Sequence, residues 1–379
     1  MKTSTLSKTY KNKKVLVTGH TGFKGSWLTI WLKELGADVI GYALDPETQP
    51  NNYAACKLEN KMSHVTGDIR NLDHLLQIFK KYKPEFVFHL AAQAIVRRSY
   101  VEPKMTFDTN VGGTVNILEA VRLNPSVKVF VNITSDKCYE NREWIWGYRE
   151  CDPMGGHDPY SASKGCAELI FSAYMKSFFS NSTSGDREIG MASARAGNVI
   201  GGGDWAEARL IPDCVRALVN NESIGIRNPR AIRPWQHILE PLGGYLLLGS
   251  LLHNYPETYS GPWNFGPNDI DHLTVDSVVS RFIEYWGSGK WDDLSTDQNN
   301  LHEAATLKLC CDKARTYLKW QAILRIDESL RMTSDWYKHF YINKQKEDMY
   351  PYCVHQIREY IKKAKKQKLS WLHSPCNTE

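Results

Sequence analysis

The chain has 379 residues, of which 42% are apolar and 23% are charged, and its formal net charge is +5. This length and composition can bury one large core or two ordinary ones, which excludes a disordered polymer, and so mild a charge gives no reason to expect a nucleic-acid partner. Much of the positive excess lies in a run of lysines between residues 362 and 368, which we interpret as a solvated face or frayed end outside the fold.

Short apolar runs alternate with helical stretches through the first half of the chain. The first strand is expected at residues 15–18, and Leu28, Trp31, Leu32 and Leu35 then recur at helical spacing until Gly36, a plausible helix C-cap. The later strands of the same sheet are expected at 39–43, 86–90, 129–133 and 191–194. This alternation is typical of repeated βαβ units and predicts an α/β fold with a Rossmann-type doubly wound parallel sheet.

Two further helices are expected at about 104–123 and 159–178. In the first, Gly112 and Gly113 would permit close approach by another backbone, and the helix is suited to a subunit interface. After about residue 196 the sequence becomes irregular and rich in Gly, Pro, Trp and Arg, which predicts a smaller C-terminal lobe built largely from loops.

Three glycines, Gly19, Gly22 and Gly25, follow the first strand and open the first helix. Glycines there let the backbone approach a pyrophosphate, which the positive end of the helix dipole favours. We therefore predict a dinucleotide site. Its predicted residues are Gly19, His20, Thr21, Gly22, Phe23, Gly25, Asp45, Asp68, Ile69, Leu90, Ala91 and Ala92.

Asp45 bears on the choice between NAD and NADP. An acidic residue after the second strand normally holds the ribose hydroxyls of NAD, although Asp45 lies slightly late and can instead cap the turn before Pro46. Asp68 and Ile69 would flank the adenine, and Leu90 to Ala92 would pass beside the cofactor, although these segments also suit ordinary loops. We expect NAD.

A tyrosine and a lysine stand one helical turn apart near residue 160. Asp158 and Pro159 supply an N-cap and a first-turn proline, so Tyr160 and Lys164 share one face of the helix that follows. A phenol titrates near 10, so ionising it at neutral pH needs roughly 4 kcal/mol of stabilisation, which Lys164 and a nicotinamide cation could supply together. Tyr160 could then take a hydroxyl proton while hydride leaves the same carbon.

The nine cysteines are odd in number and form no C-x-x-C pair. This pattern favours reduced thiols over a disulfide framework or a zinc site, so no metal is expected. Residues 1–14 lack the apolar segment of a signal peptide, and the longest apolar stretch, near 245–252, is far shorter than the roughly 20 residues that cross a bilayer. We expect a cytoplasmic protein without a membrane span.

The glycine motif, Tyr160-x-x-x-Lys164 and the segment 134–137 together resemble the extended short-chain dehydrogenase/reductase family, in its branch of NAD-dependent epimerases and dehydratases. Within it, the resemblance is to nucleotide-sugar 4,6-dehydratases that act on CDP-glucose. It covers roughly residues 12–338. The segments that carry it are 19–28, 135–141, 197–205, 233–237 and 264–267.

The resemblance implies three steps: oxidation of glucose carbon 4, loss of water across carbons 5 and 6, and return of hydride from NAD to carbon 6. By matching position, Tyr160 is the oxidation base, Lys164 orients it and Ser135 helps bind the 4-hydroxyl. Asp136 would protonate the departing 6-hydroxyl. Lys137 replaces a glutamate of the relatives that use dTDP-glucose; it is either the carbon-5 base, if neutral, or a charged stabiliser of the enolate.

Further expectations follow from the same resemblance. Asn198 and Arg233 match substrate-contacting positions of the family, and Arg209 is added because arginine forks suit phosphate oxygens. Trp235 and His237 are equally compatible with core packing. The family implies a homodimer or homotetramer and a place in deoxysugar synthesis for lipopolysaccharide O-antigen. The domains would be 12–196 for NAD, 197–340 mainly for substrate with some segments returning to the first domain, and 341–379 as a basic extension.

Two other functions remain open. A sugar-nucleotide 4-epimerase would use the same cofactor and Tyr160 but would not need Asp136 or Lys137. A redox-silent NAD-binding sensor could keep the fold without turnover, although intact Ser135, Tyr160 and Lys164 argue against it.

Overall fold

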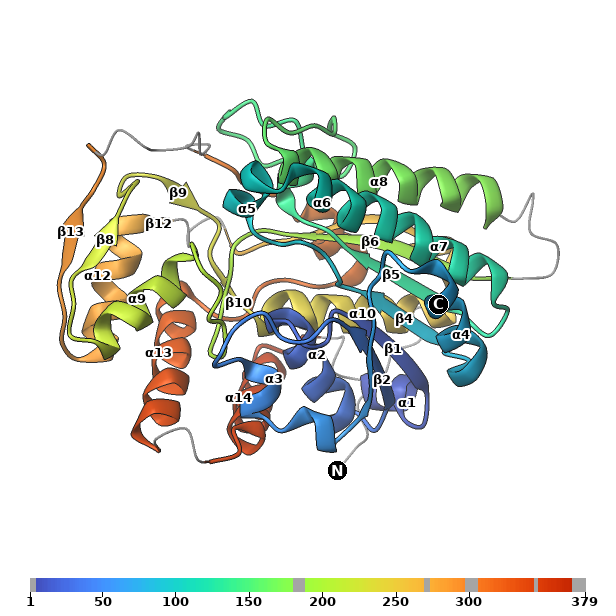
Figure 1. Ribbon diagram of the computed structural model, residues 1–379, viewed down its shortest axis with the longest axis horizontal. Helices are drawn as coiled ribbons and strands as arrows, with labels where there is room; N and C mark the ends of the chain where they lie inside the picture. Colours follow the sequence, from blue (N-terminus) through green and yellow to red (C-terminus); the bar gives the residue numbers. More distant parts are fainter. Residues whose placement is uncertain (1–4, 180–187, 269–272, 297–305, 344–346, 370–379) are drawn as a thin grey trace.

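The computed structural model describes residues 5–179, 188–268, 273–296, 306–343 and 347–369. Its main sheet has seven strands in the order β11-β6-β5-β4-β1-β2-β3, each parallel to its neighbours (Figure 1). The predicted Rossmann-type doubly wound sheet is confirmed, because the strand order changes direction between β1 and β4. The strands are β1 Lys14–Thr18, β2 Asp38–Ala43, β3 Ser63–Thr66, β4 Phe86–His89, β5 Val129–Ile133, β6 Gly190–Ala196 and β11 Gly261–Phe265.

Helices cover both faces of this sheet, and alternate residues of its central strands pack in two separate cores. Val15 and Val17 of β1 pack in one core with α2 and α10, whereas Leu16 packs in the other with α4, α7 and α8 (Figure 1). Strands buried on both faces explain the continuous apolar runs in the sequence. The helices are α1 Thr5–Tyr10, α2 Phe23–Glu34, α4 Leu72–Tyr82, α7 Gly113–Leu123, α8 Pro159–Phe178 and α10 Leu239–Asn254.

A smaller lobe follows β6 and lies at the left of Figure 1. It contains three two-stranded sheets, β7 with β10, β9 with β12, and β8 with β13, together with packed helices. Its elements are β7 Val199–Ile200, α9 Leu210–Val219, β8 Ile224–Ile226, β9 Ile232–Arg233, β10 Gln236–His237, β12 Leu273–Thr274, α12 Val275–Trp286, β13 Trp291–Asp293 and α13 Ile326–Ile342.

Short elements connect these parts. They are α3 Asn52–Ala55, the 3₁₀ turn η1 Leu58–Asn60, α5 Val96–Val101, α6 Pro103–Phe107, the π-helical η2 Asp108–Gly112, the 3₁₀ turn η3 Asp136–Cys138, α11 Pro256–Tyr259 and the π-helical η5 Ala314–Leu318.

Strand β11 was not among the predicted strands, although it pairs with β6 at the edge of the main sheet. Its sequence, Gly-Pro-Trp-Asn-Phe, lacks the β-branched run that marks the others, and it carries the buried Asn264. The side chain of Asn264 accepts a hydrogen bond from the hydroxyl of Tyr139 (2.8 Å) and donates one to the carbonyl of Tyr148 (2.8 Å). Because the buried Asn264 interrupts the apolar pattern and its partners are distant in the chain, the sequence of β11 lacks the periodicity that predicts a strand.

The helix predicted at 104–123 is interrupted, because η2 separates α6 from α7 with a π-helical turn. Asn110, in that turn, donates to the hydroxyl of Ser163 on α8 (2.8 Å) and to the carbonyl of Gln93 (3.0 Å). Within the chain, a Cβ at Gly112 would meet nothing within 4 Å, so no other part of this chain approaches that residue closely. Gly113 instead lies against the side chain of Ile69.

The C-terminal segment is part of the fold, so its interpretation as a frayed end is wrong. Helix α14 (Tyr350–Lys366) packs against α2 and buries Cys353, Ile357 and Tyr360. The hydroxyl of Tyr360 donates to the buried carboxylate of Glu240 at 2.8 Å. The apolar positions of α14 recur at helical spacing and face the core, while Lys362, Lys365 and Lys366 are exposed, which confirms the alternative interpretation of a solvated face.

Within the described ranges, no helix combines the length and apolar character needed to cross a membrane. The described cysteines are all free, and Cys376 lies outside the described residues. No group of three or more metal-ligating side chains is placed to hold an ion in the part of the chain that the structure describes.

Candidate active site

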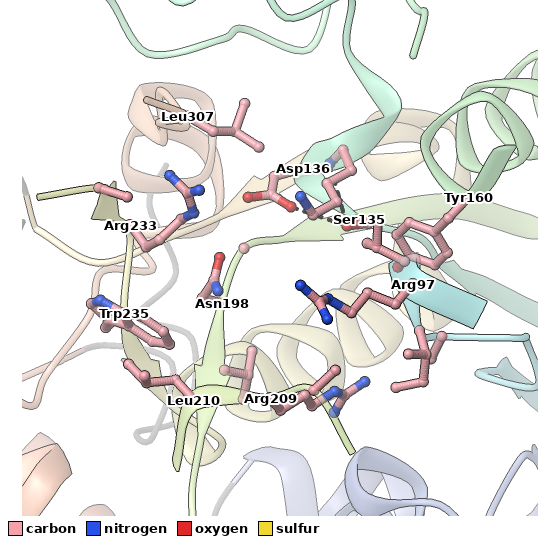
Figure 2. Close-up of a pocket in the computed structure, with 18 of the residues that line it drawn as sticks. Arg97, Ser135, Asp136, Tyr160, Asn198, Arg209, Leu210, Arg233, Trp235 and Leu307 are labelled. Carbon is pink, nitrogen blue, oxygen red and sulfur yellow. Dashed lines mark hydrogen bonds between the residues drawn. The ribbon is translucent and has the colours of Figure 1, made fainter. Parts of the chain in front are cut away.

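A cavity of about 910 Å³ opens between the carboxyl ends of the central strands and the smaller lobe (Figure 2). Loops after β5 and β6 supply one side, and α9, β8 and β9 supply the other. A doubly wound sheet binds ligands at this edge, where the strand order changes direction. The cavity brings together Ser135, Asp136, Lys137, Tyr160, Asn198, Arg209 and Arg233.

The glycine loop between β1 and α2 has little room for side chains. Gly19 has a φ of 72°, and a Cβ there would lie 2.7 Å from the backbone nitrogen of Ala91. A Cβ at Gly25 would lie 2.1 Å from the carbonyl oxygen of Gly19. Gly22 caps α2 without a side-chain hydrogen bond, so the first N–H groups of that helix remain available to an anion, as a pyrophosphate requires.

The end of strand β4 lies beside the glycine loop because Thr18, the last residue of β1, binds the segment that follows β4. The Thr18 hydroxyl accepts hydrogen bonds from the backbone N–H groups of Leu90 (3.1 Å) and Ala91 (3.2 Å). Leu90, Ala91 and Ala92 are each partly buried there. The predicted cofactor segment after β4 therefore lies against the glycine loop.

His20 and Thr21 fill the space between the glycine loop and β2. The Nε2 atom of His20 lies 2.7 Å from Nδ1 of His64, and burial lowers the pKa of His20 to about 3, with the charge of His64 acting in the same direction. Thr21 donates to the carbonyl of Leu44 at 2.9 Å. These contacts fix the loop but direct neither side chain into the cavity.

The acidic candidates at this end differ in position. Asp45 is exposed beyond the end of β2. Asp68 is held by Arg70, whose Nε lies 3.0 Å from both carboxylate oxygens, and the hydrogen bond from Arg70 is the largest cause that lowers the pKa of Asp68. Ile69 is buried against Gly113. The structure thus leaves Asp45 accessible and engages Asp68 in a local ion pair.

Asp158 caps α8 as predicted. Its carboxylate accepts from the backbone N–H of Ser161 (2.9 Å) and from the Ser161 hydroxyl (2.6 Å). Tyr160 and Lys164 are both buried, with the Lys164 ammonium 5.9 Å from the centre of the Tyr160 ring. Their expected neighbourhood on one helical face is confirmed.

The electrostatics of this pair are dominated by burial. Burial raises the pKa of Tyr160 to about 12, against smaller lowering effects of the Ser135 hydrogen bond and the charge of Arg209. Burial also lowers the pKa of Lys164 to about 8. In the protein without a dinucleotide, burial therefore outweighs every lowering effect on the pKa of Tyr160, and the lowering expected from the sequence is not reached.

Ser135 caps the 3₁₀ turn η3, which contains Asp136 and Lys137 and follows β5 closely. The Ser135 hydroxyl donates to Oδ1 of Asp136 (3.0 Å), while Oδ2 of Asp136 is buried without a hydrogen-bond partner. Burial raises the pKa of Asp136, although Lys137 and Ser135 act in the opposite direction. A carboxyl with a raised pKa can hold a proton for transfer. Lys137, the next residue, is partly buried and lines the same cavity.

A buried ion pair lies behind this turn. Glu168 accepts hydrogen bonds from the hydroxyl of Ser193 (2.7 Å) and from Nη2 of Arg195 (2.7 Å), and the hydroxyl of Thr134 also donates to it. Arg195 donates in turn to the hydroxyl of Tyr139 at 2.7 Å. The residues on either side of the turn, Thr134 and Tyr139, are therefore both held by the Glu168–Arg195 ion pair, whose glutamate belongs to α8.

The residues predicted to bind substrate come from the smaller lobe. The carbonyl of Asn198 accepts from the backbone of Gln236 (3.0 Å), which joins β7 to β10. Arg209 forms an ion pair with Asp204 (3.0 Å), and Arg233 donates from Nη1 to the carbonyl of Ile232 (3.0 Å). Figure 2 shows Asn198, Arg209 and Arg233 around the cavity.

The alternatives for Trp235 and His237 separate in the structure. Trp235 lines the cavity, although only 6% of it is exposed. His237 is fully buried against Trp27, with an angle of 77° between the rings, and burial lowers its pKa to about 3. His237 is a core residue.

The sequence analysis did not predict several cations that line the cavity, among them Lys24 and Arg97. Lys24 lies inside the glycine motif, at the second residue of α2, and burial lowers its pKa to about 8, with Arg209 acting in the same direction. Arg97 follows the predicted segment 90–92 and precedes a second arginine. In each case the sequence shows a basic residue next to a predicted cofactor segment, and this position could have indicated a cation in the site.

A Rossmann-type sheet, a glycine loop at its first strand–helix junction and a Tyr–Lys pair beside the cavity define an enzyme of the extended short-chain dehydrogenase/reductase class. Comparison with known proteins narrows the class. Residues 16–248 match the family described as GDP-mannose 4,6 dehydratase, and the chain belongs to this family.

Two curated relatives are similar over most of their length. The CDP-glucose 4,6-dehydratase of Salmonella typhimurium is 49% identical over 353 residues, which cover 93% of this chain and 97% of the relative. The dTDP-glucose 4,6-dehydratase of Haemophilus influenzae is 27% identical over 347 residues, which cover 85% of this chain and 97% of the relative.

Solved structures share the fold at lower identity. The UDP-glucose 4-epimerase of Thermotoga maritima, solved with UDP-glucose, has a TM-score of 0.71 at 22% identity and covers 86% of this chain and 99% of its own. The dTDP-glucose 4,6-dehydratase DesIV of Streptomyces venezuelae, solved with NAD and TYD bound, has a TM-score of 0.72 at 22% identity. The match covers 86% of this chain and 97% of DesIV.

Proposed function

We propose that the protein is an NAD-dependent CDP-glucose 4,6-dehydratase, which converts CDP-D-glucose into CDP-4-dehydro-6-deoxy-D-glucose. One observation carries the proposal beyond the family: the buried Asp136, with its raised pKa, faces the same cavity as Tyr160. An acid beside the oxidation base is what elimination of water requires and what a 4-epimerase does not need. The Salmonella relative supports the choice of nucleotide.

The glycine loop suits a dinucleotide, because a Cβ at Gly19 or Gly25 would clash with neighbouring backbone, so this tight turn requires glycine, and no side chain caps the N-terminus of α2. Bound there, NAD would accept hydride from sugar carbon 4 and later return it to carbon 6. Gly19, Gly22 and Gly25 would hold its pyrophosphate at the N-terminus of α2. Asp45 would reach the adenosine ribose from its exposed position after β2.

The residues of the cavity divide the proton transfers between them. Tyr160 would remove the proton of the 4-hydroxyl, with Ser135 holding that hydroxyl and Lys164 favouring the phenolate. Oxidation at carbon 4 makes the hydrogen on carbon 5 acidic, and Lys137 would take that proton or stabilise the enolate. Asp136 would then give its proton to the departing 6-hydroxyl, which leaves as water.

Asn198, Arg209 and Arg233 would bind the nucleotide end of the substrate from the smaller lobe. We also propose a cytoplasmic enzyme of deoxysugar synthesis for lipopolysaccharide O-antigen, acting as a homodimer or homotetramer. Exposed apolar side chains on α7 and α8, among them Leu123, Leu169 and Phe178, favour an interface there.

The test is incubation of the purified protein with NAD and CDP-glucose, and in parallel with dTDP-, GDP- and UDP-glucose. Alkali-induced absorbance reports a 4-keto-6-deoxy sugar. We expect a signal with CDP-glucose alone that is lost in Tyr160→Phe. Silence with every donor while NAD still binds would reject the dehydratase and favour the epimerase or the sensor.

A further inference from the structure

Arg97 places a guanidinium in the cavity from the side of the main sheet. It is the second residue of α5, and Figure 2 shows its side chain directed toward the space between Tyr160 and Asn198. Its Nε is buried and has no hydrogen-bond partner. A buried N–H without an acceptor is costly, so a ligand that supplies one would bind favourably at this position.

The neighbouring side chains do not supply that acceptor. Asp213 also lines the cavity, and the charge of Arg97 is one of the effects that act to lower its pKa, but its carboxylate is paired with Arg216. Asp204 is already paired with Arg209. Arg98, the next residue along α5, lies outside the cavity and forms ion pairs with Glu102 (2.6 Å) and Glu47 (3.0 Å).

The chemistry of a nucleotide sugar limits what Arg97 could meet. The sugar and a pyrimidine base are neutral, so the diphosphate is the one anionic group of such a substrate. A guanidinium fork matches phosphate oxygens in geometry as well as charge. The cofactor pyrophosphate has its own place at the glycine loop, before α2.

We propose that Arg97 binds the diphosphate of the substrate from the main-sheet side of the cavity, opposite Arg233 of the smaller lobe. The inference rests on the proposed function, since it assumes a sugar nucleotide in this cavity. Arg97 belongs to α5 and Arg233 to β9, so the diphosphate bridges the two parts of the molecule. Arg97 thereby fixes the distance between the anchored nucleotide and the sugar beside Tyr160.

The experiment measures binding of CDP, cytidine and NAD by calorimetry to the full-length wild type and to Arg97→Ala, Arg97→Lys and Arg98→Ala. We expect Arg97→Ala to weaken CDP binding about 10- to 100-fold, because a hydrogen bond to a charged group is lost. Cytidine and NAD should bind as in the wild type. Arg97→Lys should recover part of the affinity, and Arg98→Ala should match the wild type.

Retained NAD binding also reports that each variant is folded. The proposal is overturned if Arg97→Ala binds CDP like the wild type, if it weakens cytidine as much as CDP, or if it weakens NAD instead. If the wild type prefers UDP, dTDP or GDP, the proposed nucleotide is wrong, and the same variants tested with that diphosphate still decide the role of Arg97. If the wild type binds no nucleoside diphosphate, both proposals fall.

Discussion

Asp136 combines a catalytic position with the environment that suits an acid. Its carboxyl is 3% exposed, and Gly197 leaves room for it, since a Cβ at that glycine would lie 2.9 Å from Oδ2 of Asp136. Burial raises its pKa because the charged form loses solvation. The protonated form is therefore favoured in the cavity more than in water.

Asp136→Asn should separate oxidation from dehydration. Asparagine keeps the shape but supplies no comparable acid, so we expect dehydration to slow about 10²- to 10⁴-fold. Oxidation of carbon 4 by NAD, with Tyr160 as the base, should continue, so reduced nicotinamide should accumulate in a single turnover with CDP-glucose, visible by its absorbance. Full dehydratase activity in this variant would contradict the assigned role, and thermal unfolding checks that the fold is intact.

At the element scale, the glycine loop shows which of the sequence's glycines are needed for a close approach. Gly19→Ala would place its Cβ against the backbone of Ala91 at a positive φ, whereas Gly112→Ala meets no atom within 4 Å. We expect Gly19→Ala to abolish detectable NAD binding and to lower stability, while Gly112→Ala changes stability by less than about 1 kcal/mol. Titration of NAD and thermal unfolding of both variants measure this; equal effects would refute it.

Helix α8 carries Tyr160, Lys164 and Glu168 at successive turns, so one element links the reacting phenol to the buried ion pair. Burial lowers the pKa of Lys164, whereas the negative charge of Glu168 raises it. Glu168→Gln removes that charge and also leaves Arg195 buried without its carboxylate partner. The variant therefore tests position and charge together.

We expect Glu168→Gln to lower kcat about 10-fold or more, to lose about 3–5 kcal/mol of stability, and to move the alkaline limb of the pH profile to lower pH. The limb moves in that direction because Lys164 then loses its proton more readily. Glu119→Gln, which breaks a partly exposed pair with Arg122 on α7, is the matched control and should change none of these three quantities. An unshifted pH profile would leave Glu168 a structural residue only.

At the scale of the whole molecule, the C-terminal helix closes over a buried carboxylate. Glu240 accepts from the backbone N–H groups of Ile323 (2.8 Å) and Leu324 (2.6 Å) and from the hydroxyl of Tyr360. Burial nevertheless raises the pKa of Glu240 to about 7. The folded state therefore binds its proton more tightly than the unfolded state does.

This raised pKa predicts how stability depends on pH. Between the unfolded pKa near 4.3 and the folded value of about 7, the native state holds more protons, so the contribution of Glu240 falls as pH rises through that window. Glu240→Gln should remove as much as ~3 kcal/mol of this dependence. Denaturant unfolding at pH 5 and pH 8 measures it, and parallel curves for wild type and variant would contradict it.

The proposed subunit interface also belongs to this scale. Leu169 on α8 is 60% exposed, and Ile342 at the end of α13 is 75% exposed in the other lobe. We expect Leu169→Asp to give monomers in analytical ultracentrifugation, because a charge in an apolar interface costs several kcal/mol. Ile342→Asp is the matched control and should leave the assembly unchanged; a dimer that survives Leu169→Asp would place the interface elsewhere.

The sequence by itself determined the features that depend on neighbours along the chain. The strands around Val15 and Val129, the glycine loop, the cap at Asp158 and the Tyr160–Lys164 spacing all arise from periodicity, capping and helical geometry, which are local properties. The tertiary structure alone decided the burial of Asp136, the entry of Lys24 and Arg97 into the cavity, the pairing of β11 and the packing of α14. Each of these depends on packing between residues far apart in the chain, so a local pattern can indicate such a feature but cannot determine it.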